Sequence, residues 1–162
     1  GAAVPVTCDL AASARQIDRT ANKLYNWRFL RTLIPKARWK ARHWPGRIDP
    51  AQLKSVRSLK AFDDLYTAPA HGFRDAEDYW RQCSALKFLE GIRVPTLLIN
   101  ARNDPFLDRT CFPYASARRN AMLYLETPCS GGHVGFIPHN LRNPFWHEAR
   151  IVQFARSQGF PH

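Results

Sequence analysis

The chain has 162 residues, of which 45% are hydrophobic, a length and composition that suit one domain with a buried core. No apolar run approaches the roughly 18–20 residues of a membrane-spanning helix. The N-terminal GAAVPVTCDL also lacks the charged start and apolar stretch of a signal peptide. Because the chain opens without Met in an apolar pattern, we expect it to be a piece of a longer protein.

The net charge of +11 is concentrated in one segment. Between Arg15 and Lys60 there are thirteen Lys or Arg and only two acidic residues, so this segment alone carries +11. The remaining residues hold eleven basic and eleven acidic side chains, which cancel. The basic character is therefore a local feature of the chain.

The cysteines indicate a reducing setting. Cys8, Cys83, Cys111 and Cys129 are widely spaced, with no C-x-x-C pair and no His at zinc spacing. A chain of this length has a core large enough to fold without a disulfide framework. We therefore predict reduced thiols, no metal site and a cytoplasmic location.

The first half of the chain predicts one strand followed by helices. Ala2–Val6 is short and apolar, as at the end of a buried strand. Apolar residues then recur every three or four positions from Ile17 to Ile34, which indicates an amphipathic helix that Pro35 ends or kinks. The further signals are a turn at Trp44–Gly46, a helix start at Asp49–Pro50, a short helix over Lys60–Tyr66 closed by Thr67-Ala68-Pro69, and a helix over Asp75–Ser84 with an acidic first turn.

The second half predicts strands that alternate with helices. Pro95–Asn100 is a continuous apolar run, typical of a parallel strand covered on both faces, and Ala121–Glu126 is a second. A crossover helix fits within Leu107–Asn120, and a final helix begins near Pro144 and ends at Gly159. This order predicts an α/β fold with a parallel sheet.

Two side chains suited to acid–base chemistry follow the predicted strands. Asp104 comes a few residues after the strand at 95–100, and His133 follows the strand at 121–126 by a similar margin. Ligands bind beyond the carboxyl ends of parallel strands, so both side chains would reach one sheet edge if the strands are neighbours. An Asp bonded to the imidazole fixes its tautomer and stabilises the imidazolium. The alternative is a plain turn residue, which an Asp before a proline usually is.

These motifs resemble the α/β-hydrolases, whose chain order is nucleophile, acid, base. More narrowly, the sequence is similar to the C-terminal part of the YheT-like branch, a group of esterases. The similarity covers nearly the whole chain. It is carried by FDD at 62–64, TAP at 67–69 with GF at 72–73, DYW at 78–80 with CSA at 83–85, VPTLLINA at 94–101, NDPF at 103–106 and GGHVGF at 131–136.

The resemblance implies a division of the chain and a chemistry. Residues 1–9 would be a core strand, 10–91 an inserted helical cap, and 92–162 the C-terminal α/β-hydrolase core, which completes the last three parallel strands. Asp104 would be the acid and His133 the base of a carboxylic ester hydrolase. Its substrates would be small-molecule or lipid esters, and the resemblance implies no metal and no organic cofactor.

The family's nucleophile has no counterpart in the sequence, since no G-x-S-x-G occurs among the 162 residues. Ser130 and Cys129 lie near His133, but a loop residue lacks the strained strand-to-helix turn that presents a nucleophile. Ser84 and Ser116 fall on or near predicted helices. We therefore expect the nucleophile in a preceding half of the same protein, and no activity from the isolated chain. The competing interpretation is a non-enzymatic basic binding module or an inactive hydrolase remnant.

The basic segment admits three interpretations. Trp, Tyr and Phe alternate with Arg and Lys between Tyr25 and Arg47. This pattern suits a peripheral contact with an anionic membrane surface, in which Trp and Arg occupy the headgroup region. It also suits nucleic-acid binding, which we rank lowest. The third interpretation is a cap helix whose apolar side packs on the protein while its arginines face water.

Overall fold

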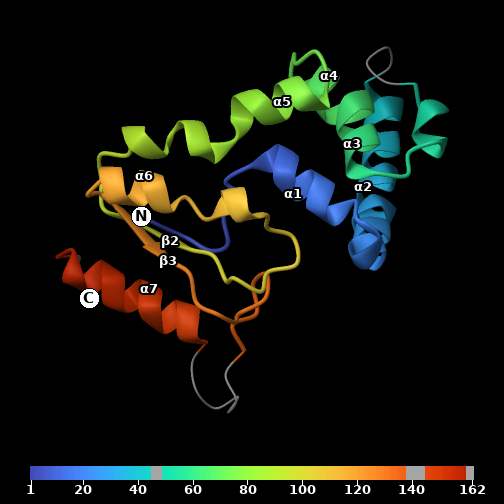
Figure 1. The fold of residues 1–162 in the computed structure, drawn as a ribbon. Coiled ribbons are helices and arrows are strands. Elements are labelled where there is room, and N and C mark those ends of the chain that lie inside the picture. Colours follow the sequence, from blue (N-terminus) through green and yellow to red (C-terminus); the bar gives the residue numbers. More distant parts are fainter. Residues whose placement is uncertain (45–48, 138–144, 160–162) are drawn as a thin grey trace. The chain divides into compact units, whose positions relative to one another are not determined.

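The computed structural model describes residues 1–44, 49–137 and 145–159 (Figure 1). The chain forms two compact units, one from Gly1–Asp9 and Ala85–His162 and the other from Leu10–Ser84. The first unit contains the sheet and the second is helical. Within the described ranges, no helix is both long and apolar enough to cross a bilayer. The role of the helical unit as a cap stays a prediction.

The sheet consists of three parallel strands in the order β1-β2-β3. They are β1 (Ala2–Ala3), β2 (Thr96–Ile99) and β3 (Leu123–Glu126). β2 lies in the centre, with its Leu97 opposite Ala2 and its Leu98 opposite Leu125. The predicted α/β class and the parallel pairing of the strands after residue 94 are therefore confirmed.

Both faces of β2 are covered, as its continuous apolar sequence predicts. Leu97 and Ile99 pack with Phe154 of α7 (Trp146–Ser157). Leu98 points to the other face, where it joins a cluster against which Ala117 of α6 (Tyr114–Arg119) packs. Figure 1 shows α6 and α7 on opposite sides of the sheet. Alternation along one short strand thus supplies both layers of this unit's core.

The remaining elements of the sheet unit are short. Two 3₁₀ turns, η4 (Ala85–Lys87) and η5 (Leu89–Gly91), precede β2, and η6 (Arg109–Cys111) follows it. The predicted crossover helix is present as α6, which Pro113 limits to the stretch after η6. Gly159, at φ +80°, follows the last helix at its predicted end, since a left-handed backbone there favours glycine.

Cys8, Cys83, Cys111 and Cys129 are not joined by disulfides in the structure. Cys8 and Cys111 are buried in the cluster on the α6 side of the sheet. Burial, followed by the neighbouring Cys111 and Asp9, raises the pKa of the Cys8 thiol to about 12. Cys8 therefore stays protonated at neutral pH and packs as a small apolar side chain.

The helical unit contains one long helix and several short ones. The elements, in chain order, are α1 (Leu10–Ile17), the 3₁₀ turn η1 (Thr20–Asn22), α2 (Lys23–His43), the 3₁₀ turn η2 (Gln52–Lys54), α3 (Leu59–Phe62), the π-helical turn η3 (Asp63–Thr67), α4 (Ala68–Ala70) and α5 (Ala76–Cys83). Its larger core cluster joins α2 to η2 and α3, and a smaller one joins α1 to α5.

Pro35 is predicted to end or to kink the helix, and the first alternative is wrong, because α2 continues through Pro35 to His43. A proline inside a helix removes one backbone hydrogen bond and crowds the preceding turn. Here Leu30 before the proline and Ala37 after it are buried in the same core cluster with Leu53. Packing of the inner face on both sides of Pro35 maintains the helix despite the local cost.

Other predicted helix boundaries differ from those of the structure. The helix expected to start at Asp49–Pro50 is only the turn η2, although Asp49 accepts a bond from the Ala51 amide at 2.8 Å. The helix over Lys60–Tyr66 is confirmed, but helical backbone runs on to Ala70, since Pro69 sits in the first turn of α4, where proline is tolerated. The turn predicted at 44–46 lies largely outside the described residues.

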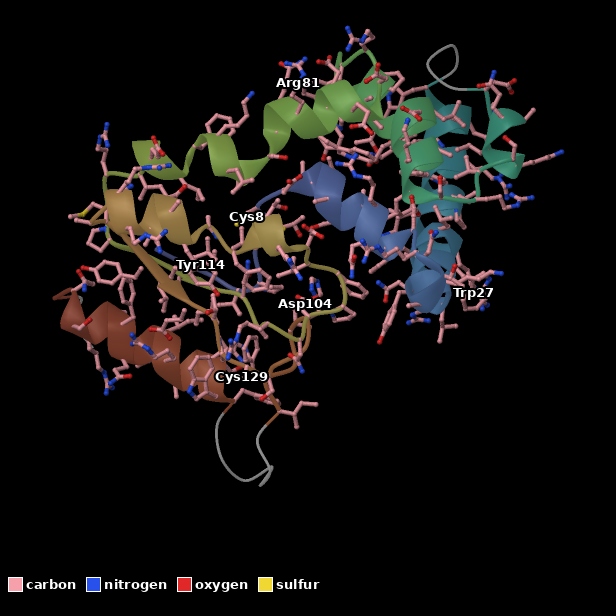
Figure 2. The ribbon with its side chains drawn as sticks, viewed as in Figure 1. Cys8, Trp27, Arg81, Asp104, Tyr114 and Cys129 are labelled. Atoms are coloured by element: carbon pink, nitrogen blue, oxygen red, sulfur yellow. The ribbon has the colours of Figure 1, made fainter. Side chains whose placement is uncertain are left out.

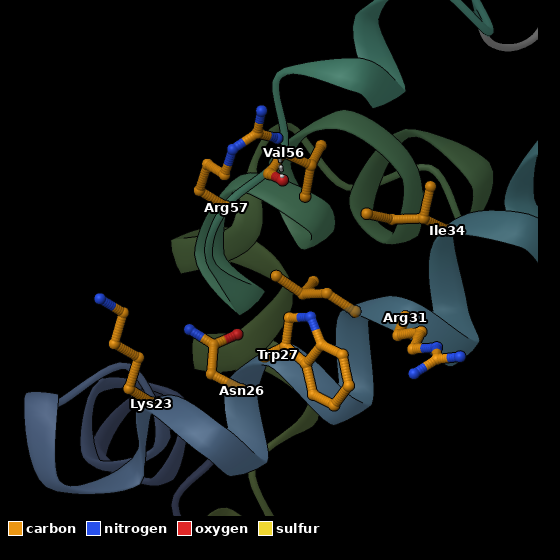
Figure 3. A pocket seen from close by; sticks show the side chains of 8 residues that line it. Lys23, Asn26, Trp27, Arg31, Ile34, Val56 and Arg57 are labelled. Carbon is orange, nitrogen blue, oxygen red and sulfur yellow. Dashed lines mark hydrogen bonds between the residues drawn. The ribbon is translucent and has the colours of Figure 1, made fainter.

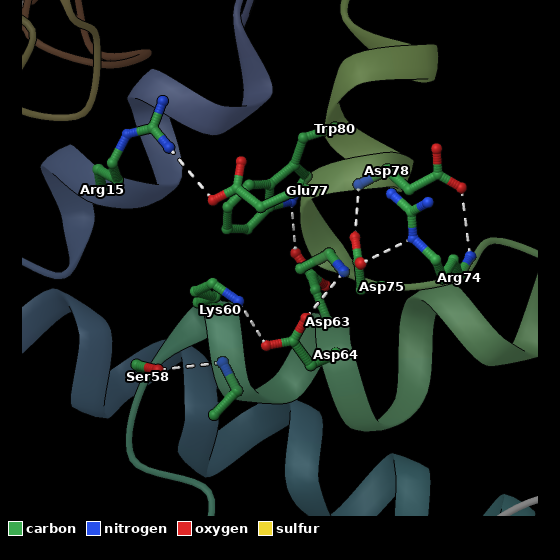
Figure 4. Close-up of polar contacts among 12 residues, drawn as sticks. Arg15, Ser58, Lys60, Asp63, Asp64, Arg74, Asp75, Glu77, Asp78 and Trp80 are labelled. Atoms are coloured by element: carbon green, nitrogen blue, oxygen red, sulfur yellow. Dashed lines mark hydrogen bonds and ion pairs between the residues drawn. The ribbon is translucent and has the colours of Figure 1, made fainter.

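Carboxylates connect the short helices of this unit to one another (Figure 4). Asp63 accepts from the indole Nε1 of Trp80 at 2.8 Å. Asp64 accepts from the Ala76 amide at 2.8 Å, at the start of α5. Asp75 caps α5 as predicted and accepts from the Asp78 amide at 2.7 Å. The acidic residues of 63–78 therefore act as acceptors within the unit, while the cations of α2 stay on its surface.

Burial raises the pKa of the Asp63 carboxyl, although bonds from Thr67 and Trp80 oppose the shift. A raised pKa in the folded state means that the ionised form is disfavoured by folding. The stability that Asp63 contributes is therefore fully present below the ordinary Asp pKa and is lost as the pH rises through the folded pKa.

We expect Asp63→Asn to remove this pH dependence, since the amide oxygen still accepts from Trp80. At pH 7 the variant should be at least as stable as the parent chain, and this advantage should shrink as the pH falls toward about 4. Urea unfolding at both pH values measures the difference. Glu77→Gln, which neutralises an exposed carboxylate of α5, is the charge-matched control. A stability difference that stays constant between the two pH values would contradict the prediction.

The amide of Asn100 fixes the segment that follows β1. The side chain is fully buried, and its Oδ1 accepts from the Val6 amide at 2.7 Å. Its Nδ2 donates to the Val6 carbonyl at 2.9 Å and to the Cys111 carbonyl at 2.7 Å. The strand predicted over 2–6 is limited to Ala2–Ala3, because at Val6 this side chain takes the place of a neighbouring strand.

Asn100→Ala would leave the Val6 amide and the Cys111 carbonyl without their side-chain partner, whereas the Val6 carbonyl would keep its bond from the Cys8 amide. We expect the free energy of unfolding to fall by about 3 kcal/mol, within the range for unsatisfied buried polar groups. Chemical denaturation monitored by circular dichroism measures it, with exposed Arg109→Ala as the control. A loss below about 0.5 kcal/mol would show that the three bonds do not hold this region together.

Candidate active site

The loops after β2 and β3 run side by side at the carboxyl edge of the sheet. The Asn100 amide donates to the Glu126 carbonyl at 3.0 Å, and the Arg102 amide donates to the Pro128 carbonyl at 2.8 Å. Figure 2 shows Asp104 and Cys129 in these loops. The backbone pairing thus continues beyond the strands and sets the spacing of the two loops, which contain Asp104 and His133.

Asp104 and His133 are in direct contact. His133 Nδ1 lies 2.8 Å from Asp104 Oδ2. The Asp104 side chain has no exposed surface, and its Oδ1 accepts from the Phe106 amide at 2.8 Å. The His133 side chain is 35% exposed and its ring packs edge-on against Phe106, with 4.7 Å between centroids. The structure therefore brings together the two residues that the sequence selected, one buried and one open to solvent.

Asn103 holds the loop of His133, a role that the sequence analysis did not identify. Its Oδ1 accepts from the amides of Gly131 and Gly132, both at 3.0 Å. Within the motif NDPF at 103–106, the sequence analysis gives a role only to Asp104. The signal that could have identified Asn103 is its place beside the acid, because short polar side chains commonly bind nearby backbone amides. Together with the contact between His133 and Asp104, these bonds join the two loops at three points close to the imidazole.

Two glycines in the His133 loop are required by space and by backbone angle. A Cβ on Gly131 would lie 2.4 Å from a ring carbon of Phe136 and 2.9 Å from the Ala101 side chain. Gly132 has φ +62°, in the left-handed region that favours glycine. Phe136 is itself buried against the sheet with Phe154. The loop therefore closes tightly over the core beneath His133.

A cavity of about 770 Å³ lies beside His133 and is open on one side to solvent. Its apolar walls include Val134, Ile137 and Trp146, all of which are exposed. Asp, Glu, Lys and Arg do not occur among the described residues that line it. Such a lining suits uncharged, apolar groups more than charged ones.

The serines and the cysteine weighed as nucleophiles differ in their surroundings. Ser130 and Cys129 are exposed in the loop after β3, and Ser130 lines the cavity. Ser84 donates to the Trp80 carbonyl at 2.7 Å and accepts from the Leu10 amide, so its role is structural. Ser116 lies on α6. The described residues contain no group of three or more His, Cys, Asp or Glu that could hold a metal ion.

Comparison with curated proteins finds esterases and lipases. YheT of Escherichia coli, described as a candidate esterase, is 42% identical over 145 residues, which cover 88% of this chain and 42% of YheT. The medium-chain fatty acid ethyl ester synthase/esterase 2 of Saccharomyces cerevisiae is 38% identical over 62% of this chain and 22% of its own length. The phospholipase ABHD3 of Mus musculus is 30% identical over 78% of this chain and 31% of its own length.

The chain spans less than half the length of these relatives. No family model and no solved structure matches it. The parallel sheet and the similarity to esterases agree with each other and with the motifs of the sequence. The chain therefore belongs to the YheT-like α/β-hydrolases and matches the C-terminal portion of that fold.

Proposed function

We propose that this chain supplies the acid and the base of a serine-type carboxylic ester hydrolase, with Asp104 as the acid and His133 as the base. The observation that carries the proposal is the 2.8 Å contact between His133 Nδ1 and a buried Asp104 oxygen. A structural Asp–His pair needs no cavity beside it, whereas this imidazole borders one of about 770 Å³. A solvent-accessible histidine with a buried carboxylate behind it is suited to general acid–base catalysis.

In this proposal each ring nitrogen has its own role. With the proton of the neutral ring on Nδ1, which lies 2.8 Å from Asp104 Oδ2, Nε2 has the lone pair that can take a proton. Nε2 removes the hydroxyl proton of the nucleophile as it attacks the ester carbonyl and later returns that proton to the leaving alcohol. Asp104 fixes the tautomer and stabilises the imidazolium in between.

The nucleophile is a serine from another part of the same protein, since the chain contains no G-x-S-x-G. The greater length of the relatives is consistent with this. The oxyanion hole would come with the serine, because one of its donors is the amide after the nucleophile. Without these parts an Asp–His pair retains little of the rate enhancement of a triad.

Lipid esters are the proposed substrate class. The relatives include an ethyl ester synthase/esterase, a phospholipase and a monoacylglycerol lipase of yeast. The apolar walls beside His133 favour acyl chains over charged groups. We further propose that the helical region, residues 10–91, is the cap that encloses the substrate. The resemblance to this family implies neither a metal nor an organic cofactor.

We expect Asp104→Asn to lower kcat for a short-chain p-nitrophenyl ester by about 10⁴-fold, as loss of the orienting carboxylate does in triad enzymes, and His133→Ala to do so at least as strongly. The assay uses the longest natural polypeptide that contains these residues. His71→Ala, at an exposed histidine of the helical unit, is the control and should leave kcat unchanged. A Ser130→Ala loss of the same size would instead identify Ser130 as the nucleophile.

The 162-residue chain alone is expected to show no ester turnover above the background of free imidazole. Incubation with a fluorophosphonate that labels activated serines tests this directly by intact mass. Stoichiometric labelling together with fast turnover would mean that a complete site exists within these residues, and the proposal of an external nucleophile would be wrong.

Asn103→Ala should loosen the His133 loop, because the Gly131 and Gly132 amides lose a shared acceptor. We expect upfield amide proton shifts at both glycines and faster solvent exchange of the His133 Nδ1 proton in NMR spectra, with a stability loss of roughly 1–2 kcal/mol. Asn103→Asp retains the acceptor and should preserve the spectrum. If His133 behaves identically in all three proteins, Asn103 does not position it.

A further inference from the structure

The helical unit contains an apolar groove that the proposed ester chemistry does not use. It lies along α2 and the segment at Val56–Arg57 and has a volume of about 510 Å³ (Figure 3). Trp27, Leu30 and Ile34 provide one stripe of α2, at the spacing that places side chains on one helix face. Val56 closes the stripe from the other side.

Cationic side chains lie on both sides of this groove. Figure 3 shows Lys23, Asn26 and Arg57 on one side of the pocket and Arg31 with Ile34 on the other. The Arg57 guanidinium is held in place by bonds to the carbonyls of Lys54 and Val56, at 2.7 and 2.9 Å. Neither Asp nor Glu is among the described lining residues. The groove therefore has an apolar stripe with cations on both sides of it.

The Asn26 amide is fixed at the edge of the groove. Asn26 is 8% exposed, and its Nδ2 donates to Asp18 Oδ1 at 2.8 Å. The same Asp18 oxygen accepts from the Leu59 amide, so the orientation of the Asn26 amide is fixed. Asn26 Oδ1 is covered by the surrounding atoms. The charged contacts available to a ligand in the groove therefore come from its cations.

We propose that this groove binds a single-chain amphiphile with an anionic headgroup, the chemistry of a monoacyl glycerol phosphate. The chain would lie on the stripe of Trp27, Leu30 and Ile34. The phosphate would pair with Lys23 and Arg57. Binding here does not depend on the ester hydrolysis proposed above.

A membrane surface would engage α2 differently. Trp39 and Trp44 are each more than half exposed, and neither lines the groove. A flat anionic bilayer would contact these indoles and Arg42 as well as the groove residues. A single bound amphiphile would contact only the groove residues. Substitutions of exposed residues outside the groove therefore distinguish the two kinds of partner.

Isothermal titration of the 162-residue chain with 1-O-dodecyl glycerol 3-phosphate, below its micelle concentration, tests the proposal. The ether link prevents hydrolysis, so the result is independent of the proposed esterase function. We expect saturable one-to-one binding. Glycerol 3-phosphate, which lacks the chain, and 1-O-dodecyl glycerol, which lacks the phosphate, should each bind at least roughly tenfold more weakly. Absence of saturable binding by the complete amphiphile would overturn the proposal.

Matched variants on the same helix locate the site. Lys23→Gln combined with Arg57→Gln should weaken binding roughly tenfold or more, and so should Trp27→Ala. Arg42→Gln and Trp39→Ala remove the same kinds of group outside the groove and should change the affinity less than about twofold. All these positions are exposed, and thermal unfolding confirms that each variant is folded. Equal losses in the controls would mean that the basic helix binds as a surface, and the groove proposal would be wrong.

Discussion

The carboxyl edge of the sheet depends on the buried amide of Asn100. Three backbone groups from two distant segments converge on it, and none of them has a strand to pair with at that point. Burying unpaired carbonyls and amides would be unfavourable, so the segment at Val6 and the turn at Cys111 are held where this side chain can reach them. The loop that begins immediately after Asn100 therefore starts from a fixed position, and the same loop contains Asp104.

The Asp104–His133 pair is built on that rigid base by a second set of bonds. Pairing of Arg102 with Pro128 continues the sheet, and Asn103 then holds the glycines beside the imidazole. Asp104 is shielded from water and receives the Phe106 amide, so one oxygen remains for His133. A carboxylate oriented in this way restricts the ring to a single arrangement, which is what a proton-transferring group requires.

The acidic and the basic side chains of the helical unit lie in different surroundings. In the helical unit, the acids between 63 and 78 accept bonds from backbone amides, an indole and a lysine, so they connect α3 to α5. α2 has seven Lys or Arg and no acid, and its aromatic side chains are largely exposed. Among the described residues that line the cavity at His133 there is neither a cation nor an acid, so this cavity suits neutral groups.

The parallel α/β class, both strands after residue 94, the cap of α5 and the meeting of Asp104 and His133 at one sheet edge were all predictable from the sequence. Periodicity, turn chemistry and the order of residues after a strand are local properties of a chain. Asn100 and Val6 are 94 positions apart, and no local pattern marks such a bond. The same holds for Asn103 and for the passage of α2 through Pro35, where burial of Leu30 and Ala37 outweighs a local helix breaker. Each of these features depends on groups that meet only after the chain has folded, so no local sequence pattern reveals it.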